Sequence, residues 1–359
     1  MAALLCAAMS ACVSVERPRD PQIPRDRPAP YRPAKPRPVT PRPPAAIQTG
    51  AIAQGLDAYI NQQWSQFPGK TGIAVLKIDG GGLAGKRVNE YFPQQSVSKM
   101  WVAMTILDLV DQGKLTLNQT VRITPDDLVL FNQPIEARVR NEGFVDEPII
   151  NLMNIAITAS DNAANDSLLR TAGGPDAVRA FIAKRGLGRI RFGPGERLLQ
   201  SGTAGLVWRQ EYSVGNSFKT ARAQLSYEAR KSALDRYLAD PIDGASPEAI
   251  VTALARLARG ELLSPASTQL LLNLMSQVKS GPQRLKAGVP TDWTFVHKTG
   301  TGQDLPPVST GYNDIGIMTA PDGTRYAVAV MMSDTTASVP QRMQFMQSIS
   351  SGVALFHNK

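Results

Sequence analysis

The sequence contains few of the residues from which metal and redox sites are built. Among 359 residues there are two cysteines and two histidines. Both cysteines, Cys6 and Cys12, lie in the first twelve residues, so the rest of the chain can form no internal disulfide. A zinc site needs three or four His, Cys or carboxylate ligands at suitable spacing, and these four residues cannot supply a plausible set. The sequence therefore predicts neither a metal nor another cofactor.

The chain also lacks the features of two other classes of protein. After the first twelve residues there is no run of 18 or more apolar residues, so no later segment is predicted to span a bilayer. Of the formal charge of +9, residues 15–44 carry +5, from eight Lys and Arg against three Asp and Glu. The remaining +4 forms no basic helix and no basic-aromatic pattern, so we do not expect nucleic-acid binding.

Two segments precede the predicted globular domain. Residues 1–12, MAALLCAAMSAC, resemble the apolar core of a signal peptide, although no basic residue precedes the apolar run. The end of this segment resembles a bacterial lipobox, in which Cys12 would be lipidated; an ordinary cleaved signal or an unstructured N-terminus is the alternative. Residues 13–46 are a basic, proline-rich spacer that cannot pack a core. We therefore expect a monomeric, periplasmic protein that is attached to a membrane by a lipid.

Residues 47–359 have the pattern of an α+β domain. Strand patterns occur near both ends, over 71–93 and 294–334, and a closing helix covers 340–357. Between them we expect helices over 98–112, 148–158, 162–172, 175–185, 218–238, 247–258 and 265–279. Strands from both ends of the chain would share one sheet. The predicted fold is an antiparallel sheet flanked by helices (47–95 and 281–359), an all-helical lobe (96–280), and a cleft between the two lobes.

The shortage of histidine restricts how a nucleophile could be activated. His357 lies two residues from the C-terminus and His297 lies inside a predicted strand, so a Ser-His-Asp triad has no obvious base. A desolvated lysine is the physical substitute. Lys99 precedes a mostly apolar helical segment, and Ser96 lies three residues earlier, on the same helical face. Burial would disfavour the ammonium form of Lys99 and prepare it to accept the Ser96 proton. Alternatively, Lys99 reaches solvent and Ser96 only caps the helix.

Two further polar clusters follow along the chain. Residues 160–162 are Ser-Asp-Asn at a predicted helix start, and residues 298–300 are Lys-Thr-Gly on a predicted strand. Taken alone, the first could be a helix cap and the second an exposed lysine before a turn. Together and in this order, S-x-x-K, S-D-N and K-T-G are the motifs of class A β-lactamases and penicillin-binding proteins. From about residue 50 to the C-terminus the sequence resembles that superfamily, and class A most closely.

The resemblance implies a role for each residue of these motifs. Ser96 would attack the carbonyl of a β-lactam or an acyl-D-alanyl peptide, and Lys99 would take part in removing its proton. Ser160 would pass a proton to the leaving nitrogen, while the backbone N–H groups of Ser96 and Thr301 would form an oxyanion hole. Asn162 would position Lys99 and the substrate amide.

The resemblance also implies where the substrate would bind. The substrate carboxylate would be held by residues of the K-T-G strand, Lys298, Thr299, Gly300 and Thr301. Many class A enzymes place an arginine on the next strand, where this chain has Asn313; we expect Arg284 to replace it, although it could be an ordinary surface charge. Phe131 corresponds to the aromatic wall of the site, and could equally be a core residue.

A glutamate that activates water distinguishes class A β-lactamases from the peptidases of the superfamily. In the family a Glu-x-x-Leu-Asn element holds this water, and here residues 196–200 read Glu-Arg-Leu-Leu-Gln. Glu196 is therefore the expected base, and Gln200 replaces the asparagine with a longer amide that can still bind water. Residues 201–242 resemble an insertion near the cleft, which contains Glu211 as a second candidate for the base.

Three functions remain open at this level. The expected one is a class A serine β-lactamase that forms an acyl-enzyme on Ser96 and releases it through Glu196. The second is a D-alanyl-D-alanine carboxypeptidase or other penicillin-binding enzyme that acts on peptidoglycan. The third is a catalytically weak protein that binds the cell wall. The Glu196–Gln200 element favours the first.

Overall fold

The computed structural model describes residues 51–80 and 82–357. The predicted signal peptide with Cys12 and the predicted spacer at 13–46 lie outside the described residues. Within the described part, no helix is both long and apolar enough to cross a membrane.

Five antiparallel strands form the main sheet, in the order β2-β1-β11-β10-β7. The first two come from the N-terminal part of the domain and the others from its end, as the sequence predicts. Their bounds are β1 (Lys70–Lys77), β2 (Leu83–Lys86), β7 (Thr294–Thr301), β10 (Tyr312–Thr319) and β11 (Arg325–Asp334). In the register, Val75 of β1 faces Val328 of β11, and Asn313 of β10 faces Gly300 of β7. Strand β7 is therefore an edge strand.

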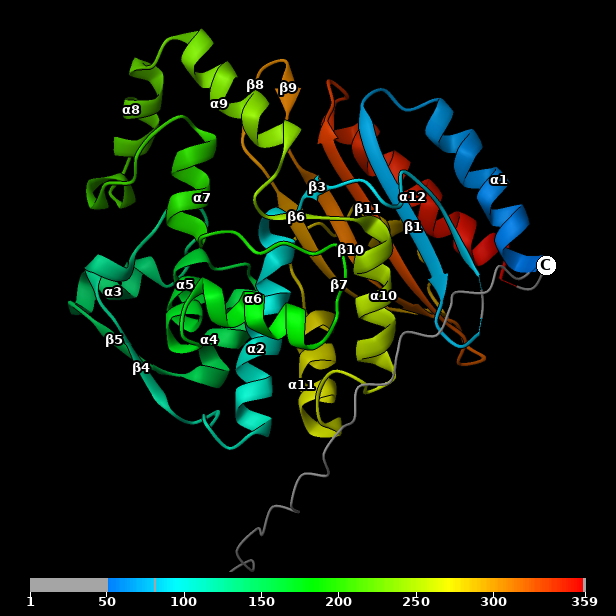
Figure 1. The fold of residues 1–359 in the computed structure, drawn as a ribbon, viewed down its shortest axis with the longest axis horizontal. Helices are drawn as coiled ribbons and strands as arrows, with labels where there is room; N and C mark the ends of the chain where they lie inside the picture. The colour runs from blue at the N-terminus through cyan, green and yellow to red at the C-terminus, as the bar shows by residue number, and fades with distance from the viewer. Residues whose placement is uncertain (1–50, 81, 358–359) are drawn as a thin grey trace, which may run out of the picture. The chain divides into compact units, whose positions relative to one another are not determined.

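Each face of the sheet packs against helices because successive side chains of a strand point to opposite faces. Ile73 and Val75 of β1 pack against α1 (Ala51–Ser65) and α12 (Val339–Leu355). Ala74 and Leu76 point the other way, into the large core. Figure 1 shows α1 and α12 together on one side of β1. The expected α+β architecture, a sheet flanked by helices, is confirmed.

The predicted helical region contains most of the expected helices within one or two residues of their predicted ends. Helices α2, α4, α5 and α6 pack together at lower left in Figure 1. The helices of this region are α2 (Lys99–Asp111), α3 (Glu136–Glu142), α4 (Ile149–Thr158), α5 (Asn162–Thr171), α6 (Pro175–Lys184), α7 (Glu196–Thr203), α8 (Ser217–Gln224), α9 (Tyr227–Ala239), α10 (Pro247–Ala258) and α11 (Pro265–Ser276). Helix α10 differs from our expectation because it packs against β1 and β11, so it belongs with the sheet.

Short elements complete the domain. The small strands are β3 (Phe92–Pro93), β4 (Thr120–Ile123), β5 (Val145–Pro148), β6 (Gly244–Ala245), β8 (Asp304–Leu305) and β9 (Val308–Ser309). The 3₁₀ turns are η1 (Gln95–Ser98), η2 (Pro125–Asp127), η3 (Gln210–Ser213) and η4 (Leu285–Gly288). Of these, η1 and β8 border the site.

The predicted helix over 218–238 is in fact two helices, α8 and α9. The chain is extended at Leu225, and the Ser226 hydroxyl accepts a hydrogen bond from the Ala229 N–H at 3.1 Å. A serine in this position satisfies one of the free N–H groups of a helix start. The break at Ser226 lets α8 and α9 take different directions above α7 (Figure 1).

Candidate active site

Ser96 and Lys99 form the centre of the site. Ser96 lies in η1, the tight turn that leads into α2, and Lys99 is the first residue of α2. The Lys99 Nζ donates a hydrogen bond to the Ser96 Oγ at 3.0 Å. Lys99 is 1% exposed, so the alternative in which its amine reaches solvent is wrong. The lysine and the hydroxyl are therefore placed for proton transfer.

Lys99 also forms an ion pair with the buried carboxylate of Glu196. This pair compensates for the hydration that the ammonium loses on burial. We expected a desolvated lysine, and the structure adds a carboxylate partner that the sequence analysis did not assign to it. The Lys99 amine thus contacts both the Ser96 hydroxyl and the Glu196 carboxylate.

Glu196 is the first residue of α7, and its position is fixed by its neighbours. Its backbone N–H donates to the Asp166 Oδ1 at 3.1 Å, and Gln200, one turn later, donates to the Glu196 Oε2 at 3.2 Å. Burial raises the pKa of Asp166 to about 6, and the nearby Glu196 charge adds to this effect. Gln200 is thus in the place where it could help to hold a water molecule beside Glu196.

A second hydroxyl-amine pair lies beside the first. The Lys298 Nζ donates to the Ser160 Oγ at 3.0 Å, although 138 residues separate the two. Burial lowers the pKa of Lys298 well below its usual range, and the charges of Lys99 and Arg284 lower it further. Ser160 has a φ of +58°, a strained backbone value for serine that is common at functional sites. The S-x-x-K, S-D-N and K-T-G motifs therefore meet at one place.

The end of β7 approaches η1 so closely that only glycine fits between them. A Cβ at Gly300 would lie 2.3 Å from the Gln94 carbonyl oxygen. The side chain of Asn313, on β10, donates to the carbonyl oxygens of Pro93 and Gln94, just before Ser96. These contacts hold η1, the turn that carries Ser96 (the nucleophile turn), against the end of β7.

Arg284 reaches the site only through Thr301. It is 7% exposed and donates to the Gly300 and Asn313 carbonyl oxygens and, at 2.6 Å, to the Thr301 Oγ1. Its guanidinium also lies 3.7 Å from the Tyr312 ring centroid. Arg284 is therefore no surface charge, but it does not line the cleft; it orients the Thr301 hydroxyl and adds positive charge behind it.

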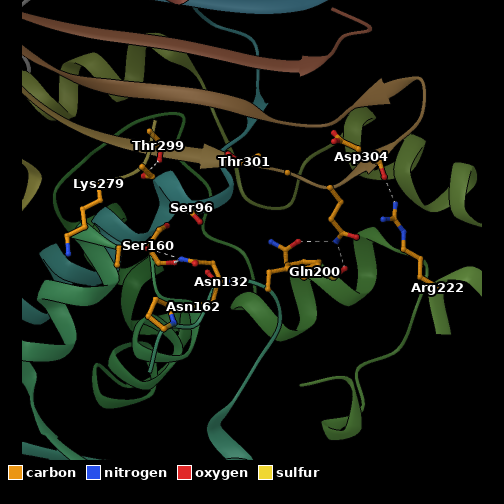
Figure 2. A pocket seen from close by; sticks show the side chains of 16 residues that line it. Ser96, Asn132, Ser160, Asn162, Gln200, Arg222, Lys279, Thr299, Thr301 and Asp304 are labelled. Atoms are coloured by element: carbon orange, nitrogen blue, oxygen red, sulfur yellow. Dashed lines mark hydrogen bonds between the residues drawn. The ribbon is translucent and has the colours of Figure 1, made fainter. Parts of the chain in front are cut away.

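A cleft of about 800 Å³ opens over these residues (Figure 2). Of the residues expected from the sequence, those that line it are Ser96, Phe131, Ser160, Asn162, Gln200, Thr299 and Thr301. Lys99, Glu196 and Lys298 lie behind this wall and act on the groups that line it. Phe131 is 48% exposed, so it is a wall residue and not a core residue.

Two expectations need correction. Asn162 does not hydrogen-bond to Lys99; its side-chain amide donates to the Leu130 carbonyl oxygen at 2.8 Å and so braces the cleft wall. Glu211 is not a second candidate for the base, because its side chain is 64% exposed, pairs with Arg209 and does not line the cleft. The insertion therefore leaves Glu196 as the expected base.

A buried network beneath the nucleophile was not predicted from any sequence pattern. Tyr237, from the insertion, donates to Asp243 at 2.9 Å and accepts a 2.6 Å hydrogen bond from the Gln95 amide. Asp243 also accepts the Gln95 backbone N–H at 2.8 Å, which supports a φ of +53° at Gln95. Burial raises the pKa of Asp243 to about 6. Helix α9 of the insertion thus helps to fix the position of Gln95, the residue before Ser96.

Further polar residues line the cleft and were not predicted. They are Asn132, Lys279, Ser280, Gln303, Arg222 and Asp304. Asn132 donates to the Ser160 carbonyl oxygen at 3.0 Å, and Ser280 shares a 2.5 Å hydrogen bond with Thr299. In the part of the chain that the structure describes, no three His, Cys, Asp or Glu side chains converge to hold a metal ion.

Comparisons with known proteins agree with this geometry. Residues 54–355 match a family described as "Beta-lactamase enzyme family". The chain is 31% identical over 252 residues to the extended-spectrum beta-lactamase PER-1 of Pseudomonas aeruginosa, covering 69% of this chain and 70% of that protein. It is 26% identical over 267 residues to beta-lactamase VEB-1 of the same organism, covering 74% and 78%.

Solved structures show the same fold. A beta-lactamase from Chitinophaga pinensis is 27% identical and superposes with a TM-score of 0.69, covering 85% of this chain and all of that one. The TLA-3 extended-spectrum beta-lactamase has a TM-score of 0.71 at 24% identity, over 86% of this chain and all of that one. With a family match over most of its length and a site that brings all three motifs together, the chain belongs to the beta-lactamase enzyme family, in its class A branch.

Proposed function

We propose that this enzyme hydrolyses the amide bond of β-lactams through an acyl-enzyme on Ser96, and that Glu196 activates the water that releases the product. The observation that carries the proposal is the position of the Lys99 Nζ, 3.0 Å from the Ser96 Oγ and paired with Glu196 at the same time. One nitrogen thus links the nucleophile to the carboxylate that would serve as base.

In the first half of the reaction Ser96 is acylated. Its Oγ attacks the lactam carbonyl carbon while its proton passes to the Lys99–Glu196 pair. The oxyanion that forms is stabilised by the backbone N–H groups of Ser96 and Thr301. The lactam C–N bond then breaks, and the nitrogen takes a proton from Ser160; the proton that the Lys99–Glu196 pair took from Ser96 replaces it. The Lys298 Nζ donates a hydrogen bond to the Ser160 Oγ at 3.0 Å and so orients this hydroxyl.

In the second half the acyl group is released. A water between Glu196 and Gln200 attacks the ester carbonyl and gives its proton to the Glu196 carboxylate. The ester bond breaks, Ser96 regains a proton and the opened product leaves as a carboxylic acid. The Gln200 amide, 3.2 Å from the Glu196 Oε2, supports this arrangement because both groups could hydrogen-bond the same water.

Substrate binding follows from the charges around Ser160. The ring carboxylate of the β-lactam would lie against the hydroxyls of Thr299 and Thr301, with the Arg284 guanidinium supplying positive charge behind Thr301 and the Lys298 amine serving as a hydrogen-bond donor beside Ser160. Phe131 forms an apolar wall of the cleft.

Nitrocefin and a fluorescent penicillin together test this function. We expect many turnovers of nitrocefin, and none in Ser96→Ala. A stable fluorescent acyl-enzyme without turnover would instead indicate a penicillin-binding peptidase. Absence of labelling would indicate a protein without acyl-transfer activity.

We also propose that the N-terminal segment directs the enzyme to the periplasm, that Cys12 is lipidated and that the catalytic domain is monomeric. The MSAC sequence and the proline-rich spacer support the first two points. Mass spectrometry of the mature N-terminus tests them: a diacylglyceryl-modified Cys12 is expected, and an unmodified end beyond Cys12 would contradict lipidation.

A further inference from the structure

The inserted segment places an arginine in the wall of the cleft. Arg222, on α8, lines the cleft, and its Nη2 donates to the Asp304 carbonyl oxygen at 2.9 Å. In Figure 2, Arg222 lies at one end of the view and Lys279 and Ser160 lie at the other, with Ser96 between them. Arg222 is thus a cleft residue remote from the lysines that serve Ser160.

The charge of Arg222 is only partly compensated within the described part of the chain. No carboxylate there forms an ion pair with Arg222 or with Arg230, which lies near it on α9, and the Nε of each is buried without an acceptor. The nearby Asp304 carboxylate accepts a hydrogen bond from Ser309 instead. Burial lowers the pKa of Arg222, and the charge of Arg230 lowers it further. An anion at this end of the cleft would therefore be stabilised by a partly desolvated guanidinium that forms no ion pair within the described residues.

The position of Arg222 relative to Ser96 indicates which part of a substrate would reach it. With the lactam carbonyl at Ser96 and the ring carboxylate at the Ser160 end, the acyl side chain extends the opposite way, along Gln200 and Gln303 toward Arg222. Gln303 is fixed there by a 2.7 Å hydrogen bond to the Gln200 carbonyl oxygen. The ring carboxylate of the substrate already has partners in Thr299 and Thr301. A substrate anion at Arg222 must therefore belong to the acyl side chain.

We propose that Arg222 binds a carboxylate on the acyl side chain of the substrate, and that the insertion thereby makes the enzyme prefer dianionic β-lactams. This inference rests on the proposed β-lactamase function. A guanidinium and a carboxylate can form two parallel hydrogen bonds, which gives geometric selection as well as attraction.

Benzylpenicillin and carbenicillin test the proposal, because they differ only by a carboxyl group on the acyl side chain. The quantity to measure is the ratio of kcat/KM for carbenicillin to kcat/KM for benzylpenicillin, in which any loss of folded enzyme cancels. In Arg222→Gln we expect this ratio to fall about tenfold, as a charge-assisted hydrogen bond is lost. Arg222→Lys, which keeps the charge without the planar fork, should give an intermediate ratio.

Lys219→Gln is the matched control, because Lys219 is an exposed residue of the same helix that does not line the cleft. It removes the same charge and should leave the ratio unchanged. An unchanged ratio in Arg222→Gln, or an equal loss for both penicillins, would overturn the proposal and leave Arg222 as a tether between α8 and β8.

The same experiment gives a different result if the proposed β-lactamase function, rather than the role of Arg222, is wrong. If the unaltered enzyme hydrolyses neither penicillin, the β-lactamase function itself is wrong. The role of Arg222 is then decided by equilibrium binding of the two penicillins to Ser96→Ala, with and without Arg222→Gln. A tenfold loss of carbenicillin affinity relative to benzylpenicillin supports it, and parallel affinities contradict it.

Discussion

The Glu196 carboxylate forms a buried ion pair with the Lys99 ammonium across 97 residues of sequence. The side chains are 6% and 0% exposed, respectively. Removal of one member of a buried pair leaves an uncompensated charge and commonly costs about 3–5 kcal/mol of stability. The pair thus couples the site's chemistry to the domain's stability.

Glu196→Gln is expected to trap the acyl-enzyme. The amide keeps the shape of the side chain but cannot accept a proton from water. Lys99 remains 3.0 Å from the Ser96 Oγ to take the proton of the nucleophile, so acylation would be faster than release. Intact-protein mass spectrometry should show a lasting adduct with benzylpenicillin, and the free energy of unfolding should fall by about 3 kcal/mol.

Glu211→Gln is the matched control for this variant, since Glu211 is an exposed glutamate outside the cleft. It should turn over nitrocefin at the unaltered rate and leave no adduct. An adduct in Glu211→Gln would place the base in the insertion instead.

Gly300→Ala should disrupt the contact between β7 and the nucleophile turn. The added Cβ would meet the Gln94 carbonyl oxygen at 2.3 Å, and neither backbone can give way cheaply. Because the proposed oxyanion hole, formed by the N–H groups of Ser96 and Thr301, spans this contact, we expect a loss of about 100-fold or more in kcat for nitrocefin.

Gly202→Ala gives the comparison for Gly300→Ala. Gly202 lies in α7, and beyond the backbone of that helix an added methyl group would meet no heavy atom within 4 Å. The variant should be neutral or stabilise the helix by up to about 1 kcal/mol. Equal kcat values for both alanine variants would show that the close approach at Gly300 has no catalytic consequence.

Asp166→Asn should stabilise the protein above pH 6. The pKa of Asp166 is raised to about 6 in the folded state, so folding favours the protonated acid. Its contribution to stability is full below about pH 4 and is lost as the pH rises through 6. An asparagine cannot ionise, and the variant should gain as much as about 2 kcal/mol at pH 8.

Urea unfolding of both proteins at pH 4, 6 and 8 measures this effect. The stability difference should be small at pH 4 and grow toward pH 8. A difference that is the same at all three values would show that Asp166 does not titrate in this range.

Tyr237→Phe should weaken the support beneath Gln95. The hydroxyl donates to the Asp243 Oδ1 and accepts from the Gln95 Nε2, and its removal takes a hydrogen-bond partner from each of these two buried atoms. We expect a loss of about 1–3 kcal/mol in the free energy of unfolding. Tyr227→Phe, at a 44% exposed position of the same helix, should cost less than about 0.5 kcal/mol. Equal effects would mean that the buried network contributes no stability.

Local patterns predicted most of the fold. The mostly apolar segment of α2 and the continuous apolar runs of β1 and β11 are local properties, so these elements lie where expected. Ser226 could have been recognised as a helix cap, but the apolar residues on either side of it favoured one continuous helix. Helix α10 was assigned to the wrong lobe because an apolar face does not show what it will pack against.

The site was predictable only where motifs identify it. Ser96, Ser160 and Lys298 belong to three short motifs, and the structure brings these together. Tyr237, Arg222 and Gln303 belong to none, and they reach the site through contacts between distant segments. Similarly, the ion pair of Lys99 depends on the tertiary contact between the first residues of α2 and α7, which no spacing in the sequence reveals.

The central claim is that Ser96 is acylated and that Glu196 is needed to release it. Its most direct test is the time course of intact mass for Glu196→Gln after a brief exposure to benzylpenicillin, with the adduct located by peptide mapping. We predict that Ser96 carries the whole opened penicillin and keeps it long after the unaltered enzyme has returned to its original mass. An adduct on another residue, or one that disappears as fast as in the unaltered enzyme, would contradict it.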